Sequence, residues 1–287
     1  MPNYTEYFEL ERPALMSIAY QMLGERAAAQ DLVQDAWEIW NKADKATIDS
    51  PPAWLRTVTN RLAIDALRSA RKKREVYVGP WLPEPLIEDV QGGPDAALAL
   101  AKDCELALMW AMERLTIEER SAFILRKVFD SDYAELSEVL GKTEANCRKI
   151  VSRASQKIAS TKLKFNVTQS ETYALLSKFT QACAAKNHDQ VLSLLAPDVV
   201  SISDGGGHVR AALRPLFGAL EVSGVLLSIL RKYSSNSTTH RTNVNGQPAL
   251  IISANNQLNT VLTIGVNDAG LIAWIYMMRN PYKLRLC

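Results

Sequence analysis

Cysteine and histidine are scarce in this chain, which has 287 residues but only four cysteines and three histidines. The cysteines stand far apart, at Cys104, Cys147, Cys183 and Cys287, and form no CxxC pair. This spacing excludes a disulfide scaffold and a metal site built from Cys and His ligands. We therefore expect buried or idle thiols in a reducing compartment, with no metal and no cofactor.

Long hydrophobic runs are also lacking. No segment approaches the roughly 20 continuous apolar residues of a membrane-spanning helix. Residues 1–13 include acidic side chains and lack the apolar core of a signal peptide. The apolar fraction of 47% and the charged fraction of 22% are those of an ordinary globular protein and exclude a disordered chain. We expect a cytoplasmic protein that does not bind membranes.

The net charge is low, at +2, which taken alone argues against a nucleic-acid-binding protein. Its distribution argues the opposite. The net charge is −5 over residues 1–54, +6 over 55–74, −7 over 75–120, and +4 over both 121–165 and 166–287. Because phosphate binding depends on local clusters of cations, these basic islands indicate nucleic-acid binding.

Helical spacing of apolar residues predicts three helices in the first 75 residues. The second, from about Ala27 to Asn41, carries four polar residues on one face, at i, i+3, i+4 and i+7. A solvated face is the simple alternative, and no histidine accompanies the carboxylates to suggest a metal. Docking to a basic partner is the better functional interpretation. The four residues are Asp31, Gln34, Asp35 and Glu38.

The third predicted helix begins near Ala53 and carries the first basic island. Cations are favoured at a helix C-terminus, so a solvated helix end is the simpler alternative. Together with aromatic and amide side chains on the same helix, however, the cations favour contact with single-stranded nucleic acid. The candidate residues are Trp54, Asn60, Arg61, Arg68, Arg71 and Lys72.

Residues 76–102 are rich in proline and glycine, which predicts an extended linker. The apolar side chains in Trp81–Pro85 are unusual in an acidic spacer, so we expect this segment to dock on another part of the protein. Helical patterning then resumes, with a capping box from Thr116 to Glu119.

Tyr133–Leu140, a turn at Gly141 and a second helix capped by Thr143 have the spacing of a helix-turn-helix. The polar face of the second helix is suited to the major groove of DNA. A solvated basic helix in a helical bundle is the alternative. The candidate DNA-binding residues are Asn146, Arg148, Lys149 and Arg153.

After residue 168 the sequence predicts an α+β module with a curved antiparallel sheet. A helix is expected over 170–187, followed by strands at Val199–Ser203, Val225–Leu230, Ala249–Asn255, Asn259–Val266 and Leu271–Met278. Asp204 and His208 are a candidate acid–base pair, with His240 as a third titratable group. A tight turn at the three glycines is the simpler interpretation, and we rank catalysis below regulation or ligand sensing.

Three segments, in order along the chain, resemble bacterial extracytoplasmic-function sigma factors. They are Asp31–Trp40, Trp54–Asp65 and Leu115–Ala154, and the resemblance covers residues 1–163. It implies a multidomain fold with two all-α domains, sigma region 2 and a helix-turn-helix region 4. The implied boundaries are region 2 at 1–75, a linker at 76–102, region 4 at 103–165 and a C-terminal domain at 168–287.

The same resemblance implies partners and roles. Asp31–Glu38 would bind the β′ clamp of RNA polymerase core, and region 4 would meet the β flap. Residues Lys45–Asn60 would read and melt the −10 promoter element, with Asn60 against a base of the melted strand. Asn146–Arg153 would read the −35 element.

The C-terminal module resembles the SnoaL-like cone that regulates sigma factors of the sigma J type in cis. His208 stands where that subgroup has Lys, and Tyr282 where it has Asp. We expect the extension to pack on the linker or on the helical domains. The residues implied in this regulatory contact are Trp81, Leu82, Pro83, Glu84, Pro85, Asp204, Gly205, Gly206, Gly207, Asn280, Pro281, Lys283 and Leu284.

The sequence thus predicts a non-enzymatic, alternative sigma factor that directs promoter-specific initiation and is regulated by its own C-terminal domain. The alternative is a helix-turn-helix regulator with a ligand-sensing or enzymatic SnoaL-like domain. A small-molecule ligand of that domain stays open as a further partner.

Overall fold

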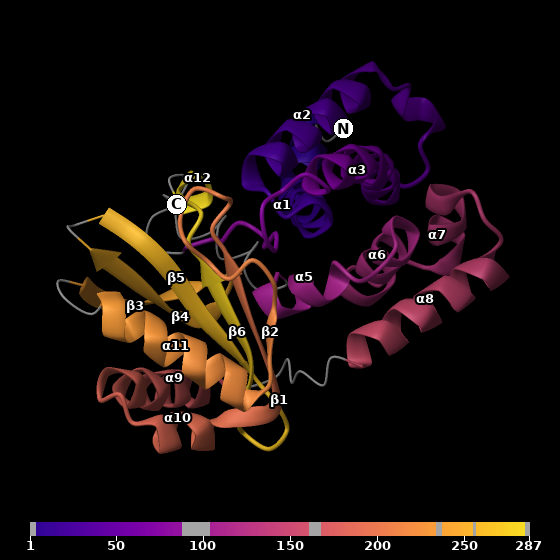
Figure 1. Cartoon of the computed structure of the whole chain (residues 1–287). Helices are drawn as coiled ribbons and strands as arrows, with labels where there is room; N and C mark the ends of the chain where they lie inside the picture. Colours follow the sequence, from indigo (N-terminus) through magenta and orange to yellow (C-terminus); the bar gives the residue numbers. More distant parts are fainter. Residues whose placement is uncertain (1–3, 88–103, 161–167, 234–236, 255–256, 285–287) are drawn as a thin grey trace. The chain divides into compact units, whose positions relative to one another are not determined.

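The computed structural model describes residues 4–87, 104–160, 168–233, 237–254 and 257–284. The chain divides into two compact units, one helical and one α+β (Figure 1). Residues 77–87, in the predicted linker, belong to the α+β unit, whereas residues 4–76 and 108–160 belong to the helical unit. None of the helices in these ranges is long and apolar enough to cross a membrane.

The helical unit begins with α1 (Tyr4–Leu23), α2 (Arg26–Lys42), a short 3₁₀ turn η1 (Lys45–Thr47) and α3 (Pro51–Arg74). Leu15 and Ile18 of α1, Trp40 of α2, and Leu55 and Leu67 of α3 are buried among these helices. The predicted helices are therefore confirmed. The third begins two residues earlier than expected because proline is well suited to the first turn of a helix.

The second half of the helical unit contains the predicted helix-turn-helix. Its elements are α5 (Leu106–Met112), α6 (Ile117–Phe123), the π-helical turn η2 (Ile124–Val128), α7 (Tyr133–Leu140) and α8 (Glu144–Ala159). The capping box at Thr116 and Glu119 is present, Gly141 ends α7, and the Thr143 side chain caps α8. These local signals fix where each helix begins and ends.

The α+β unit consists of a six-stranded sheet with helices packed on one face (Figure 1). The strand order is β2-β1-β6-β5-β4-β3. The strands are β1 (Leu195–Asp204), β2 (Leu216–Phe217), β3 (Ser237–Val244), β4 (Gln247–Ala254), β5 (Gln257–Val266) and β6 (Ile272–Met278). The helices are α9 (Gln169–Ala184), α10 (His188–Leu194), α11 (Ala219–Tyr233) and the short α12 (Pro281–Leu284).

The fold class is confirmed, but several details of this unit differ from the sequence-based expectation. Val225–Leu230, predicted as a strand, lies in α11, where Val222 and Leu226 are buried one helical turn apart. Short apolar runs cannot distinguish a strand from a buried helix. The polar edge strand β3 was not predicted. The sheet is mixed, because β1 and β6 run parallel.

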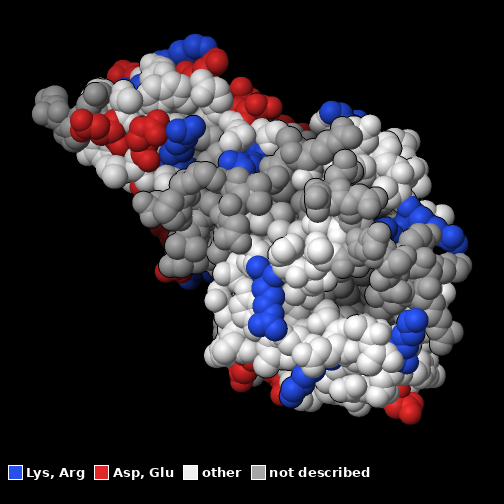
Figure 2. Space-filling view, turned by 90° about the vertical axis from the view of Figure 1, so that its left-hand side faces the viewer, with Lys and Arg blue, Asp and Glu red and all other residues white. Residues whose placement is uncertain are grey.

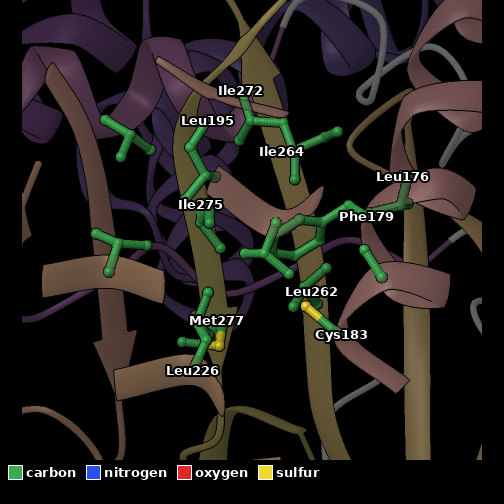
Figure 3. Close-up of a cluster of buried hydrophobic side chains, with 14 of the residues drawn as sticks. Leu176, Phe179, Cys183, Leu195, Leu226, Leu262, Ile264, Ile272, Ile275 and Met277 are labelled. Carbon is green, nitrogen blue, oxygen red and sulfur yellow. The ribbon is translucent and has the colours of Figure 1, made fainter. Parts of the chain in front are cut away.

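The interior between the sheet and its helices is apolar (Figure 3). Phe179 of α9 and Leu226 of α11 point toward Ile275 and Met277 of β6. Cys183 lies in the same cluster, and burial raises the pKa of its thiol to about 12. The strand residues that face away from this core carry the contacts with the linker.

Candidate polymerase and promoter surfaces and the linker contact

The predicted docking face of α2 is exposed. Asp31, Gln34, Asp35 and Glu38 are all on the surface of the helix. The opposite side of α2 is buried through Leu32, Val33 and Ala36, so this face is fixed in orientation by the core beneath it. The visible face of the helical unit in Figure 2 carries clustered Asp and Glu side chains. An exposed anionic surface of this kind suits a basic protein partner.

Much of the basic island on α3 contacts other groups of the helical unit. Arg61 donates a hydrogen bond to the Glu138 carbonyl (2.7 Å), and Arg71 donates to the Leu115 carbonyl (2.7 Å). Arg68 pairs with Asp65 on its own helix. Lys72 is exposed on the last turn. Two of the cations predicted to bind DNA therefore form hydrogen bonds with the part of the helical unit that spans α5–α7.

Asn60, the predicted base-contacting residue, is fully buried. The Ser121 hydroxyl of α6 donates a hydrogen bond to its side-chain oxygen at 2.6 Å. Trp54 lies nearer the start of the same helix and is half-buried. Its ring packs against the indole of Trp40, with ring centroids 5.5 Å apart. Ser121 of α6 therefore covers the side chain that was expected to contact a base.

A buried polar network joins the two helical halves. The fully buried Arg120 of α6 donates two hydrogen bonds to the Gln21 carbonyl of α1 (2.9 and 2.7 Å) and pairs with Glu113 at 2.5 Å. Arg74 of α3 contacts the second Glu113 oxygen at 3.2 Å. Burial opposes ionisation of Glu113, but Arg120 and Arg74 outweigh it and lower the pKa of the carboxyl. The network therefore contributes stability at neutral pH that is lost on acidification below the ordinary pKa of 4.5.

The second helix of the helix-turn-helix, α8, presents its candidate residues to solvent. Asn146, Arg148, Lys149 and Arg153 are exposed, whereas Cys147 on the other side is buried. The Arg148 guanidinium pairs with Glu144 (2.8 Å) and lies 4.8 Å from the centroid of the Tyr133 ring. The face predicted to enter the major groove is thus open in the helical unit.

In the α+β unit, the structure brings together the three segments expected to form a regulatory contact. Asp204, at the end of β1, is fully buried and accepts hydrogen bonds from the Tyr77 hydroxyl (2.5 Å) and the Leu82 amide (3.0 Å). Lys283 of α12 pairs with the same carboxylate at 2.8 Å and also donates to the Leu82 carbonyl at 2.6 Å. The Lys283 ammonium lies 4.2 Å from the centroid of the Trp81 ring.

The turn after Asp204 consists of glycines because the surrounding atoms leave no room for a β-carbon. A β-carbon on Gly206 would lie 2.4 Å from the Asn280 amide nitrogen, and one on Gly205 would lie 2.4 Å from a backbone oxygen. The Asn280 amide in turn donates to the Tyr77 hydroxyl at 2.8 Å. The turn is a close-packed seat for Asn280 and the linker. Pro281 and Leu284 follow in α12, and Leu284 is buried.

The remainder of the docked linker crosses the sheet. Leu82 through Ile87, including Pro83, Glu84 and Pro85, are buried. The Tyr276 hydroxyl of β6 donates to the Pro83 carbonyl at 2.7 Å. Leu86 exchanges two hydrogen bonds with Asn245, which begins the two-residue turn between β3 and β4. Docking thus uses backbone groups and buried side chains together.

The acid–base pair considered for Asp204 and His208 does not form. The Asp204 carboxylate contacts Tyr77, Leu82, Gly206 and Lys283. The His208 ring instead packs edge-on against Tyr282, with centroids 4.5 Å apart. The two departures from the sigma J pattern therefore contact each other. His240 is exposed on β3.

Glu105 is a contact residue that the sequence did not indicate. Its carboxylate accepts a hydrogen bond from the Gln247 side chain at 2.8 Å, so the turn that holds Leu86 also holds the start of α5. Burial raises the pKa of Glu105 to about 7, and the hydrogen bond from Gln247 opposes that rise. An isolated glutamate in a weakly periodic segment gives no sequence signal for such a contact.

The raised pKa of Glu105 predicts a stability that depends on pH. The folded chain binds more protons than the unfolded chain between pH 4.5 and about 7, so stability falls as pH rises through that window. Glu105→Gln is expected to remove up to about 3 kcal/mol of this dependence. Urea unfolding below and above the window measures it. Glu75→Gln, at an exposed position, is the control and should leave the pH dependence of stability intact. The same pH dependence in the unsubstituted chain, Glu105→Gln and Glu75→Gln would contradict the assignment.

The Sigma-70 region 2 family matches residues 7–73, and the Sigma-70, region 4 family matches residues 105–158. The ECF RNA polymerase sigma factor SigJ of Mycobacterium tuberculosis is 38% identical over 228 residues, which cover 79% of this chain and 73% of that protein. The probable ECF sigma factor SigI of the same organism is 29% identical over 95% of this chain and 92% of its own length.

The crystal structure of M. tuberculosis SigJ superposes on this chain with a TM-score of 0.78 at 30% identity. The match covers 99% of this chain and 98% of the SigJ chain, so it includes the α+β unit as well as the helices.

Proposed function

Since this chain belongs to the extracytoplasmic-function RNA polymerase sigma factors, and is thus an alternative sigma factor that works with RNA polymerase and promoter DNA, we propose that its α+β module regulates initiation in cis. The observation that carries the proposal is the buried carboxylate of Asp204, which binds the linker between regions 2 and 4. While the α+β unit holds this linker, the distance over which regions 2 and 4 can separate is restricted.

Region 2 is proposed to bind the β′ clamp through the exposed face of α2, and region 4 to bind the β flap. The exposure of Asp31 through Glu38 supports the first contact. Promoter recognition is assigned to α3 at the −10 element and to Arg148, Lys149 and Arg153 of α8 at the −35 element. Because RNA polymerase works in the cytoplasm, we place the chain there.

The closed helical unit supports an inactive state. Asn60 is covered by Ser121, and Arg61 contacts Glu138 in the helix-turn-helix half. Opening of this contact is required before α3 can bind a melted strand. We propose that the docked linker favours the closed state and that polymerase binding competes with it.

Run-off transcription with polymerase core tests the function and its regulation together. A chain that ends at Pro281 lacks Lys283, the cation that pairs with Asp204, and its promoter output is expected to differ several-fold from that of the full chain. Asp35→Lys should abolish output from both chains, because it reverses a charge on the polymerase face. Unchanged output after truncation would refute cis regulation. Promoter binding that ignores Asp35→Lys and needs no polymerase would instead favour a helix-turn-helix regulator.

A further inference from the structure

Lys45 occupies an aromatic and carbonyl cage at the start of the segment assigned to the −10 element. Its ammonium donates hydrogen bonds to the backbone carbonyls of Trp40 and Ala43, the latter at 2.8 Å. The same nitrogen lies 4.7 Å from the centroid of the Trp40 ring and 5.8 Å from that of Tyr4. Rings at these distances attract a cation through their electron-rich faces.

The cage is built on a rigid support. Trp40 is fully buried, and its indole nitrogen donates to the Tyr4 carbonyl at 3.0 Å. Its ring also packs against Trp54 of α3, so α1, α2 and α3 meet at this side chain. Lys45 attaches the η1 turn to that junction. The turn is closed locally as well, since the Asp44 side chain accepts from the Ala46 amide.

The orientation of Lys45 differs from that of a phosphate-binding lysine. A lysine that binds phosphate must present its ammonium to solvent. The nearby Lys42 does so, with a side chain that is 79% exposed. The hydrogen bonds of Lys45 instead go to carbonyls of its own chain. Because the ammonium is held in place by these four groups, its charge fixes the loop between α2 and α3.

We propose that Lys45 is a positioning residue for −10 recognition: the cage formed by Trp40, Tyr4 and the Ala43 carbonyl holds its ammonium, and thereby fixes residues 43–50 in the shape that captures an unpaired base beside Trp54. This inference rests on the proposed assignment of Lys45–Asn60 to the −10 element. It adds that Lys45 contributes through loop geometry and makes no phosphate contact of its own.

The test measures binding of single-stranded DNA by the holoenzyme formed from the full chain and polymerase core. The probe is a fluorescein-labelled oligonucleotide selected from a randomised pool by the unsubstituted holoenzyme. Lys45→Met retains an unbranched stem but loses the ammonium, and is expected to weaken binding about fivefold to tenfold. The slope of log affinity against log salt is expected to stay unchanged, because no phosphate contact is removed.

Lys42→Met is the matched control. It removes a positive charge from an exposed side chain three residues before Lys45. The pair that Lys42 forms with Glu38 is long (3.8 Å) and exposed to solvent, so its loss should leave polymerase binding intact and the affinity within about twofold. Lys45→Arg keeps a cation for the rings and carbonyls and should restore most of the binding. Circular dichroism melting of each variant establishes that it is folded.

Three outcomes overturn the inference. If Lys45→Met binds as tightly as the unsubstituted chain, the cage does not position the loop. If its salt slope becomes shallower by about 0.7, Lys45 contacts a phosphate in the complex. If Lys42→Met weakens DNA binding as much as Lys45→Met does, the loss of affinity reflects the overall positive charge of the protein and not the cage. Failure of the unsubstituted holoenzyme to select any oligonucleotide would instead refute the proposed −10 function itself.

Discussion

Replacing Arg120 with leucine is expected to lower the free energy of unfolding of the helical unit by about 3–5 kcal/mol. The loss has two sources. The Gln21 carbonyl would be left without the two hydrogen bonds that Arg120 donates, and Glu113 would keep only Arg74 as a partner within the network. Leucine cannot compensate for this loss, because it would face the Gln21 carbonyl and the Glu113 carboxylate without a group that can donate a hydrogen bond. Chemical denaturation followed by far-ultraviolet circular dichroism measures the change.

A double-mutant cycle with Glu113→Gln shows whether the energy comes from the network. The two substitutions should be non-additive by about 1–3 kcal/mol, because they remove the same interaction. Arg114→Leu is the matched control, since Arg114 is exposed and its guanidinium stacks on Trp110 outside the network. A similar destabilisation by Arg114→Leu, or strict additivity in the cycle, would contradict this account.

Lys283→Met is expected to release the linker from the α+β unit. It leaves the fully buried Asp204 carboxylate without its cation, a change that typically costs about 3–5 kcal/mol for a buried pair. It also removes the hydrogen bond to the Leu82 carbonyl and the contact with the Trp81 ring. Limited proteolysis within residues 77–87 and the fluorescence of Trp81 should both report exposure of the linker.

Asp204→Asn provides the reciprocal test. It removes the charge that Lys283 neutralises and keeps one of the two acceptor oxygens, either the Oδ1 that accepts from Tyr77 or the Oδ2 that accepts from Leu82. Combining it with Lys283→Met eliminates both charges, and the double variant should therefore hold the linker better than Lys283→Met alone. Lys186→Met, outside this cluster, serves as the control. Undiminished protection of the linker in Lys283→Met would show that the ion pair is dispensable for docking.

The sequence predicted the helical unit well because its signals are local. A capping box at Thr116, a glycine after Leu140 and a threonine before Glu144 each specify one helix end through nearby hydrogen bonds. The exposure of Asp35 and Arg148 follows from helical periodicity in the same way. The functional roles assigned to these faces stay predictions.

The α+β unit was harder to predict because its structure depends on distant partners. The apolar residues around Leu226 suit a strand or a helix, and only packing against the sheet decides between them. β3 is composed largely of polar residues at the sheet edge, so it has no alternating apolar pattern. That Asp204 and Lys283 share a contact with the linker was expected only from family resemblance, since no local pattern links residues so far apart in sequence. The part that Tyr77 plays in this contact was not predicted.

The burial of Asn60 shows a further limit. Its place on α3 follows from the sequence, but its cover by Ser121 depends on how two helical halves pack together. The Arg120 network has the same origin, because Gln21 contributes a backbone carbonyl and any residue type would provide one. Side-chain identity therefore gives no indication of that contact.

The docking of residues 77–87 also limits the distance that the chain between residues 77 and 105 can span. A fully extended chain from residue 77 to residue 105 can span up to about 100 Å. With Leu86 and Glu105 both bound at the β3–β4 turn, those two points are held near each other whatever the length of chain between them. The α+β unit thereby shortens the reach of the chain that connects the two Sigma-70 regions. Undocking restores that reach without any change in the folds that this segment connects.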